Sequence, residues 1–137
     1  MKVNVYFLIV GILSILFCFT HAWNGFTTVL PLIDTANFEI ITKTTFFYVW
    51  HIISIENFVF GVVFIVMAFY KDATKVKFTA WVIAIIIVAR WGVIFGSTLF
   101  KDINDVKNTL IDSVAIIIFV GLIVLGIRKI NKIAIKP

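Results

Sequence analysis

Residues 78–100 read FTAWVIAIIIVARWGVIFGSTLF, and Arg90 is the single charged residue in this stretch. The stretch is as long as the roughly 20 apolar residues that a helix needs to cross the hydrocarbon core of a membrane. Three further apolar blocks of similar length lie at residues 3–21, 45–70 and 109–127. Because lipid offers no partner to backbone N–H and C=O groups, these blocks predict transmembrane helices even though isoleucine and valine favour strands in water.

The composition of the whole chain agrees with a membrane protein. Hydrophobic residues make up 62% of the 137 residues and charged residues only 14%, whereas about a quarter of a typical soluble domain is charged. We therefore expect an all-α membrane protein with one membrane domain over residues 1–137, folded as an antiparallel four-helix transmembrane bundle. The expected connections include an outer loop at residues 22–44, and the chain ends in a basic tail at residues 128–137.

The formal net charge of +5 does not indicate nucleic-acid binding. The basic residues stand between and after the apolar blocks and form no stripe interleaved with aromatic residues, as a nucleic-acid-binding surface would. The expected partner is the lipid bilayer, with the tail continuing the fourth helix against anionic headgroups. Cys18 is the single cysteine, so an internal disulfide is excluded.

The distribution of lysine and arginine predicts the orientation of the chain, because cytoplasmic loops carry an excess of both residues. Four crossings place eight of these residues on one side and only Lys43, Lys101 and Lys107 on the other. We therefore expect both termini in the cytoplasm and a multi-pass protein of a bacterial inner (plasma) membrane. The eight residues on the cytoplasmic side are Lys2, Lys71, Lys75, Lys77, Arg128, Lys129, Lys132 and Lys136.

A cleaved signal peptide is the alternative interpretation of the first block. Lys2 would form its charged n-region, and Thr20, His21 and Ala22 loosely resemble a small-residue cleavage site. The apolar run is long for such a segment, and the three remaining spans would place the basic tail outside. We therefore expect the first block to stay in the membrane as a helix.

Small and polar residues form a stripe along each of the first two blocks, at a spacing that places them on one face of a helix. Such stripes are typical of close packing in membranes, where helices associate through small residues and side-chain hydrogen bonds. Gly92 and Gly96 form a GxxxG pair in the third block, which lets another backbone approach. The stripes are Gly11, Ser14, Cys18, His21 and Gly25 in the first block and Trp50, Ser54, Asn57 and Gly61 in the second.

Glu56 and Arg90 lie near the middle of their blocks, where a charged side chain costs roughly 2.5 to 3.5 kcal/mol. Helices joined by the short segment 71–77 bring both residues to the same depth, so we expect an ion pair with a further hydrogen bond from Asn57. Ser54 lies one turn away on the same seam. In one interpretation the pair has a structural role and determines how the two helices pack. In the other it forms a site for ligand binding or proton transfer, and the sequence leaves both interpretations open.

His21, His51 and Asp112 are expected together at the outer end of the bundle, in an outer vestibule. Two imidazoles and a carboxylate can bind zinc or relay protons, and two histidines can hold a haem. No HxxxH, HExxH or CxxC spacing is present, and His51 and Glu56 point to different sides of their helix because five residues separate them. We predict no cofactor, with a metal at His21, His51 and Asp112, or a haem, as the alternative.

Three short motifs carry a resemblance to known proteins: His21-x-x-x-Gly25, Pro31-Leu32 and Trp50-His51-x-x-Ser54. This pattern resembles small bacterial membrane proteins of four transmembrane helices that have no assigned activity. The resemblance covers roughly the first half of the chain. It implies the same architecture and no chemistry.

The sequence contains no recognisable catalytic motif: no Gly-rich phosphate loop, no nucleophile elbow and no serine with a partnered histidine at a readable spacing. We expect a protein that binds or transports a ligand, or an accessory subunit of a larger membrane complex or homo-oligomer. Its polar seam would run from the outer vestibule to Glu56 and Arg90. The alternatives are a membrane-embedded metalloprotein or enzyme with Glu56 as acid or base, and a purely structural seam.

Overall fold

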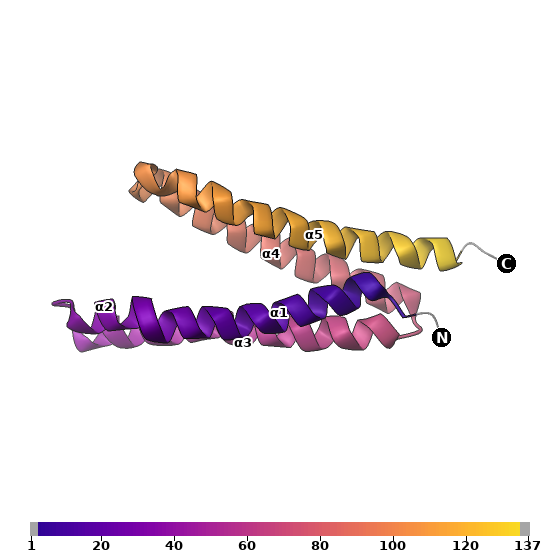
Figure 1. The fold of residues 1–137 in the computed structure, drawn as a ribbon, viewed down its shortest axis with the longest axis horizontal. Helices are drawn as coiled ribbons and strands as arrows, with labels where there is room; N and C mark the ends of the chain where they lie inside the picture. The colour runs from indigo at the N-terminus through magenta and orange to yellow at the C-terminus, as the bar shows by residue number, and fades with distance from the viewer. Residues whose placement is uncertain (1–2, 135–137) are drawn as a thin grey trace. The chain divides into compact units, whose positions relative to one another are not determined.

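The computed structural model describes residues 3–134, which form helices and no strand. Four helical segments are long and apolar enough to cross a membrane: Val5–Thr35, Ile40–Phe69, Thr74–Lys101 and Ile103–Ile130. The predicted all-helical chain with four candidate spans is therefore confirmed. In chain order the elements in Figure 1 are α1 (Val5–Asn24), a π-helical turn (Gly25–Val29), α2 (Leu30–Thr35), α3 (Ile40–Phe69), α4 (Ala73–Lys101), a 3-10 turn (Ile103–Asp105) and α5 (Val106–Ala134).

The connection between the first two spans is much shorter than the outer loop expected at residues 22–44. Only four residues, from Ala36 to Glu39, separate α2 from α3. Pro31 does not stop the helix, because it stands in the first turn of α2, where no backbone N–H is needed. The first candidate span has 31 residues, about 46 Å of helix, whereas the hydrocarbon core is about 30 Å thick.

The other helices also extend beyond the apolar blocks. α3 begins at Ile40 rather than residue 45, and α4 begins at Ala73 rather than residue 78. α5 reaches Ala134, so most of the basic tail continues the fourth helix as expected. Lys2 and Lys136, which contribute to the predicted orientation, lie outside the described residues.

The described chain divides into two compact units. One unit, which we call the glycine unit, is Gly11–Ile65. The other, which we call the hairpin unit, contains the residues up to Val10 and those from Val66 onwards.

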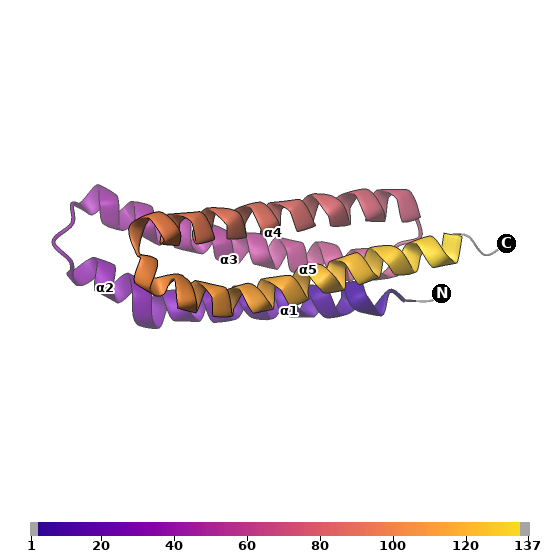
Figure 2. The same cartoon turned by 90° about the horizontal axis from the view of Figure 1, so that it is seen from above.

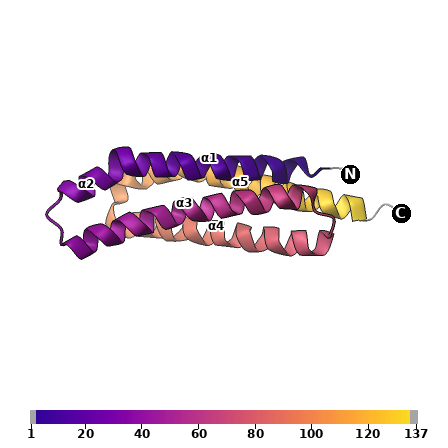
Figure 3. The ribbon, with the colours of Figure 1, turned by 90° about the horizontal axis from the view of Figure 1, so that it is seen from below.

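In the glycine unit, α1 and α3 lie side by side through their small residues (Figure 3). A Cβ on Gly11 would lie 2.6 Å from Ile65 Cγ1 and 2.9 Å from Gly61 O, and one on Gly61 would lie 2.6 Å from Ile15 Cγ1. Real Cβ atoms do not approach other atoms this closely, so the two backbones can touch only because both residues are glycine. The close packing predicted from the two stripes is confirmed here.

In the hairpin unit, α4 and α5 fold back on each other across the short link at Asp102–Asp105 (Figure 2). Trp91 Nε1 donates to Ser113 Oγ at 2.7 Å, and the Ser113 hydroxyl donates to the Thr109 carbonyl at 2.7 Å. Nearer the link, Thr109 Oγ1 lies 3.4 Å from Thr98 Oγ1. The side chains buried along these helices are Val76, Ala80, Ile83, Ala84, Ile87, Phe119, Ile123 and Ile127.

The start of α1 is bound to the end of α5 within the same unit. The Asn4 side chain donates from Nδ2 to the Gly126 carbonyl at 2.9 Å, and its backbone N–H donates to the Ala68 carbonyl at 2.9 Å. Phe7 is fully buried, and its ring occupies the space that a Cβ on Gly126 would need. Gly126 is therefore required for this contact.

Asp72 begins α4 as its N-cap. Its carboxylate accepts hydrogen bonds from the backbone N–H groups of Thr74 and Lys75, both at 3.1 Å. Such a cap satisfies N–H groups that have no partner inside the helix. The hydrogen bond from the Lys75 backbone is the main cause that holds the pKa of Asp72 below its ordinary value of 3.8.

Large apolar side chains are exposed along the spans. Ile85, Val93 and Ile117 expose 63%, 69% and 69% of their surface. A soluble protein exposes no continuous surface of this kind, whereas lipid tails are as apolar as these side chains. The exposed faces agree with helices that lie in a membrane.

We predict that Gly126→Ala destabilises the protein and that Gly121→Ala does not. The new methyl group would meet the Phe7 ring at position 126, whereas position 121 faces open space on the same helix. Overpacking of this kind costs about 1 to 3 kcal/mol, and a surface change on a helix stays within about 0.5 kcal/mol. The free energy of unfolding, measured by titration of detergent-solubilised protein with dodecyl sulfate, gives the comparison. Equal stability of the two variants would contradict this packing.

Candidate functional site

A polar cluster joins α1 to α3 inside the glycine unit. Nδ1 of His21 lies 3.0 Å from Oγ of Ser54, which is buried. The indole N–H of Trp50 donates to the His21 carbonyl at 2.9 Å. The rings of His21 and Trp50 stack with their centroids 4.4 Å apart and their planes 18° apart. We call His21, Trp50 and Ser54 the polar cluster.

Gly25 makes the polar cluster possible. It is buried at the first position of the π-helical turn, and a Cβ at this position would overlap the indole ring of Trp50. Any other residue would displace that ring and break its hydrogen bond to His21. The members of the two predicted stripes therefore meet in pairs, Gly25 with Trp50 and His21 with Ser54.

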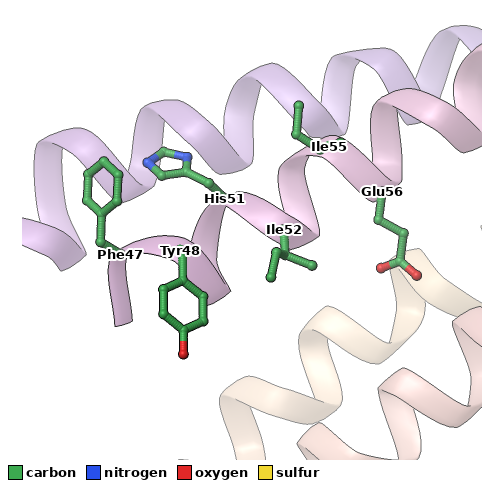
Figure 4. A pocket seen from close by; sticks show the side chains of 6 residues that line it. All are labelled: Phe47, Tyr48, His51, Ile52, Ile55 and Glu56. Carbon is green, nitrogen blue, oxygen red and sulfur yellow. The ribbon is translucent and has the colours of Figure 1, made fainter. Parts of the chain in front are cut away.

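A groove of about 500 Å³ runs along one face of α3, lined by residues of that helix alone. Figure 4 shows the lining residues as two rows of side chains that diverge from the helix. Residues four apart in a helix stand above one another, so each row follows the helix axis. One row is Phe47, His51 and Ile55, and the other is Tyr48, Ile52 and Glu56.

His51 stands in the middle of one wall among aromatic rings. Its ring centroid lies 5.0 Å from that of Phe26 and 4.6 Å from that of Phe47. Its Nε2 atom is buried and has no hydrogen-bond partner among the described residues. A buried polar nitrogen without a partner is uncommon in folded proteins.

Glu56 is the last residue of the other row, at the end of the groove nearest the middle of α3. As predicted, it points to a different side of the helix from His51, yet the two side chains border the same groove (Figure 4). Glu56, Asn57 and Arg90 all take part in interactions. The ion pair between Glu56 and Arg90 stays a prediction.

The outer vestibule of His21, His51 and Asp112 stays a prediction. His21 belongs to the polar cluster, His51 to the groove, and Asp112 is exposed on α5. Within the described part of the chain, no three His, Cys, Asp or Glu side chains come close enough to hold a metal ion.

The contact between His21 and Ser54 was not expected from the sequence, which shows no readable spacing between the two residues. They are 33 positions apart, and only the pairing of α1 with α3 brings them together. The two stripes indicated that these helix faces would pack together, because His21 belongs to one stripe and Ser54 to the other, but they did not identify this pair. The groove had no such signal, since its lining alternates aromatic, apolar and charged residues.

Comparison with protein-family models, with curated proteins and with solved structures finds no match to this chain. We therefore infer the function from the geometry of the described residues.

We predict that Trp50→Phe lowers the stability of the protein more than Trp23→Phe does. Phenylalanine keeps an aromatic ring at position 50 but loses the hydrogen bond to the His21 carbonyl, which costs about 0.5 to 1.5 kcal/mol. Trp23 is on α1 and is 72% exposed, so its replacement controls for the loss of an indole. Dodecyl sulfate titration, followed by near-ultraviolet circular dichroism, measures both. The polar cluster would have no role in stability if the two variants unfolded at the same dodecyl sulfate fraction.

Proposed function

We propose that the protein binds a small amphipathic ligand in the groove on α3. The apolar part of the ligand lies between the two rows of side chains, and its polar group forms a hydrogen bond with His51. The observation that supports this proposal is that His51, whose buried Nε2 has no partner among the described residues, lines a groove of about 500 Å³. Ligand sites of small molecules have volumes of about 300 to 1,000 Å³ and combine apolar walls with few polar groups.

A hydrogen bond to the His51 imidazole would contribute to the free energy of ligand binding. Leaving a buried polar group without a hydrogen bond costs about 1 to 3 kcal/mol, and a ligand group that forms the bond recovers part of that cost. A half-turn of the ring about its Cβ–Cγ bond exchanges nitrogen and carbon positions. Because Nε2 is buried, a ligand group can bond to it only after the imidazole turns about this bond.

Phe47, Tyr48, Ile52 and Ile55 supply the apolar walls. Tyr48 and Ile52 are 49% and 59% exposed, so the groove is open along its length. A ligand can therefore reach these side chains without a rearrangement of the glycine unit. Glu56 lines the end of the groove nearest the middle of α3 and already takes part in another interaction.

The wider architecture in which this site acts is also part of the proposal. The four spans form an antiparallel bundle in a bacterial inner membrane, with both termini in the cytoplasm. The excess of lysine and arginine beside α4 and in the tail supports this orientation. Gly92 and Gly96 face open space among the described residues, which supports a homo-oligomer or larger complex that meets α4 there. Transport would need such an assembly, because one short chain offers little room for a pathway.

The alternative of a metalloprotein or enzyme that uses His21, His51 and Asp112, with Glu56 as acid or base, stays a prediction from the sequence. No contact among the described residues favours it over ligand binding.

We predict that Ile52→Trp and His51→Phe deplete a compound that purifies with the wild-type protein. The indole fills the groove, and phenylalanine keeps the aromatic packing but removes the hydrogen bond, which lowers occupancy by about fivefold. The measurement is mass spectrometry of organic extracts from proteins purified in the same mild detergent. Ile117→Trp is the matched control, because Ile117 is exposed on α5 outside the groove. Identical extracts from all four proteins would contradict the proposal.

A further inference from the structure

One end of the hairpin unit collects basic residues from separate parts of the sequence. The hydrogen bonds of Asn4 to Ala68 and to Gly126 bring the end of α3 beside the last turns of α5. The segment that follows α3 therefore lies at the same end as the residues that follow Gly126. We call the cationic residues gathered there the basic collar: Lys71, Lys75, Lys77, Arg128 and Lys129.

The single carboxylate within these segments is Asp72, and it is already engaged. It accepts the two backbone hydrogen bonds at the start of α4 and lies 3.4 Å from the Lys75 ammonium. Lys129 is engaged as well, since it donates to the Val3 carbonyl at 3.1 Å and lies 5.9 Å from the centre of the Tyr6 ring. Lys71 and Arg128 are exposed and form no ion pair with another described residue.

The link between α4 and α5, at the other end of the hairpin unit, differs from the basic collar in its charge. It contains the carboxylates of Asp102 and Asp105, and it is flanked by two lysines, Lys101 at the end of α4 and Lys107 at the start of α5. Positive and negative charges are equal there, whereas cations outnumber carboxylates five to one in the basic collar. An anion is therefore attracted to one end of the unit and not to the other.

The position of the basic collar selects the kind of anion. Aromatic side chains stand beside it, with Tyr70 54% and Phe78 72% exposed, as is common for rings at a membrane interface. The N–H groups at the start of α4 are capped by Asp72, so the cationic side chains provide the binding groups. Cations that border apolar spans at this level meet the phosphates of lipid headgroups.

We propose that the basic collar binds the phosphates of anionic phospholipids, with Lys71 and Arg128 as the principal contacts. This binding is independent of the groove on α3. It fixes the depth of the collar end of α4 and α5 at the membrane surface.

Two double variants that each remove two positive charges test the proposal. Lys71→Gln with Arg128→Gln removes the free cations of the collar, and Lys101→Gln with Lys107→Gln removes those of the link. Native mass spectrometry of protein in detergent, titrated with phosphatidylglycerol or phosphatidylcholine, gives the affinity for the first bound lipid. We expect the collar variant to bind phosphatidylglycerol about thirtyfold more weakly, and the link variant to bind it within twofold of wild type.

Further arms separate the proposal from its alternatives. Lys71→Arg with Arg128→Lys keeps both charges and should restore binding, and circular dichroism verifies that all variants remain helical. Equal affinity of the two glutamine variants for phosphatidylglycerol would overturn the proposal, as would equal binding of phosphatidylcholine and phosphatidylglycerol by the wild type. Full displacement of the lipid by millimolar inorganic phosphate would also overturn it, because the collar would then be a site for soluble phosphate.

Discussion

In an apolar environment, the backbone N–H and C=O groups of a chain can form hydrogen bonds only with each other. Lipid accepts no unpaired N–H or C=O group, so each crossing segment must satisfy its own backbone as a helix. The helices of this chain are longer than the thickness of the hydrocarbon core. The connections between the spans are only a few residues long. Isoleucine and valine, which would favour strands in water, are accommodated because helix is the conformation available to these segments.

Once the helices have formed, their association needs a source other than the hydrophobic effect, because lipid tails are as apolar as the side chains. Both units use the same two devices. Glycine allows close approach, at Gly11 and Gly61 in one unit and at Gly126 in the other. A tryptophan N–H then joins neighbouring helices, from Trp50 to the His21 carbonyl and from Trp91 to Ser113. The groove and the basic collar occupy surfaces that these contacts leave open.

The sequence predicted the parts of the fold that depend on composition and on helical periodicity. Four apolar blocks became four candidate spans, and the stripe from Gly11 to Gly25 packs on the stripe from Trp50 to Gly61. The sequence did not predict that the helix continues through residues 25–35. The length of an apolar block indicates only the part of a helix that crosses the hydrocarbon core, and the helix itself can extend further. The groove was missed because its walls come from two rows whose members have no common chemistry. The ring of His51 contacts Phe26, which is far from it in the sequence, so the spacing of residues could not predict this contact.

In the proposed topology, these helices cross a membrane four times and the basic collar lies in the cytoplasm. Single cysteines in a Cys18→Ser background, labelled in intact cells with a membrane-impermeant maleimide, test it most directly. We expect Asn37→Cys and Asn104→Cys to react in intact cells, Lys75→Cys to react only after the membranes are opened, and Ile86→Cys within α4 to react in neither state. Labelling of Lys75→Cys in intact cells to the extent seen for Asn104→Cys would contradict the four-span topology.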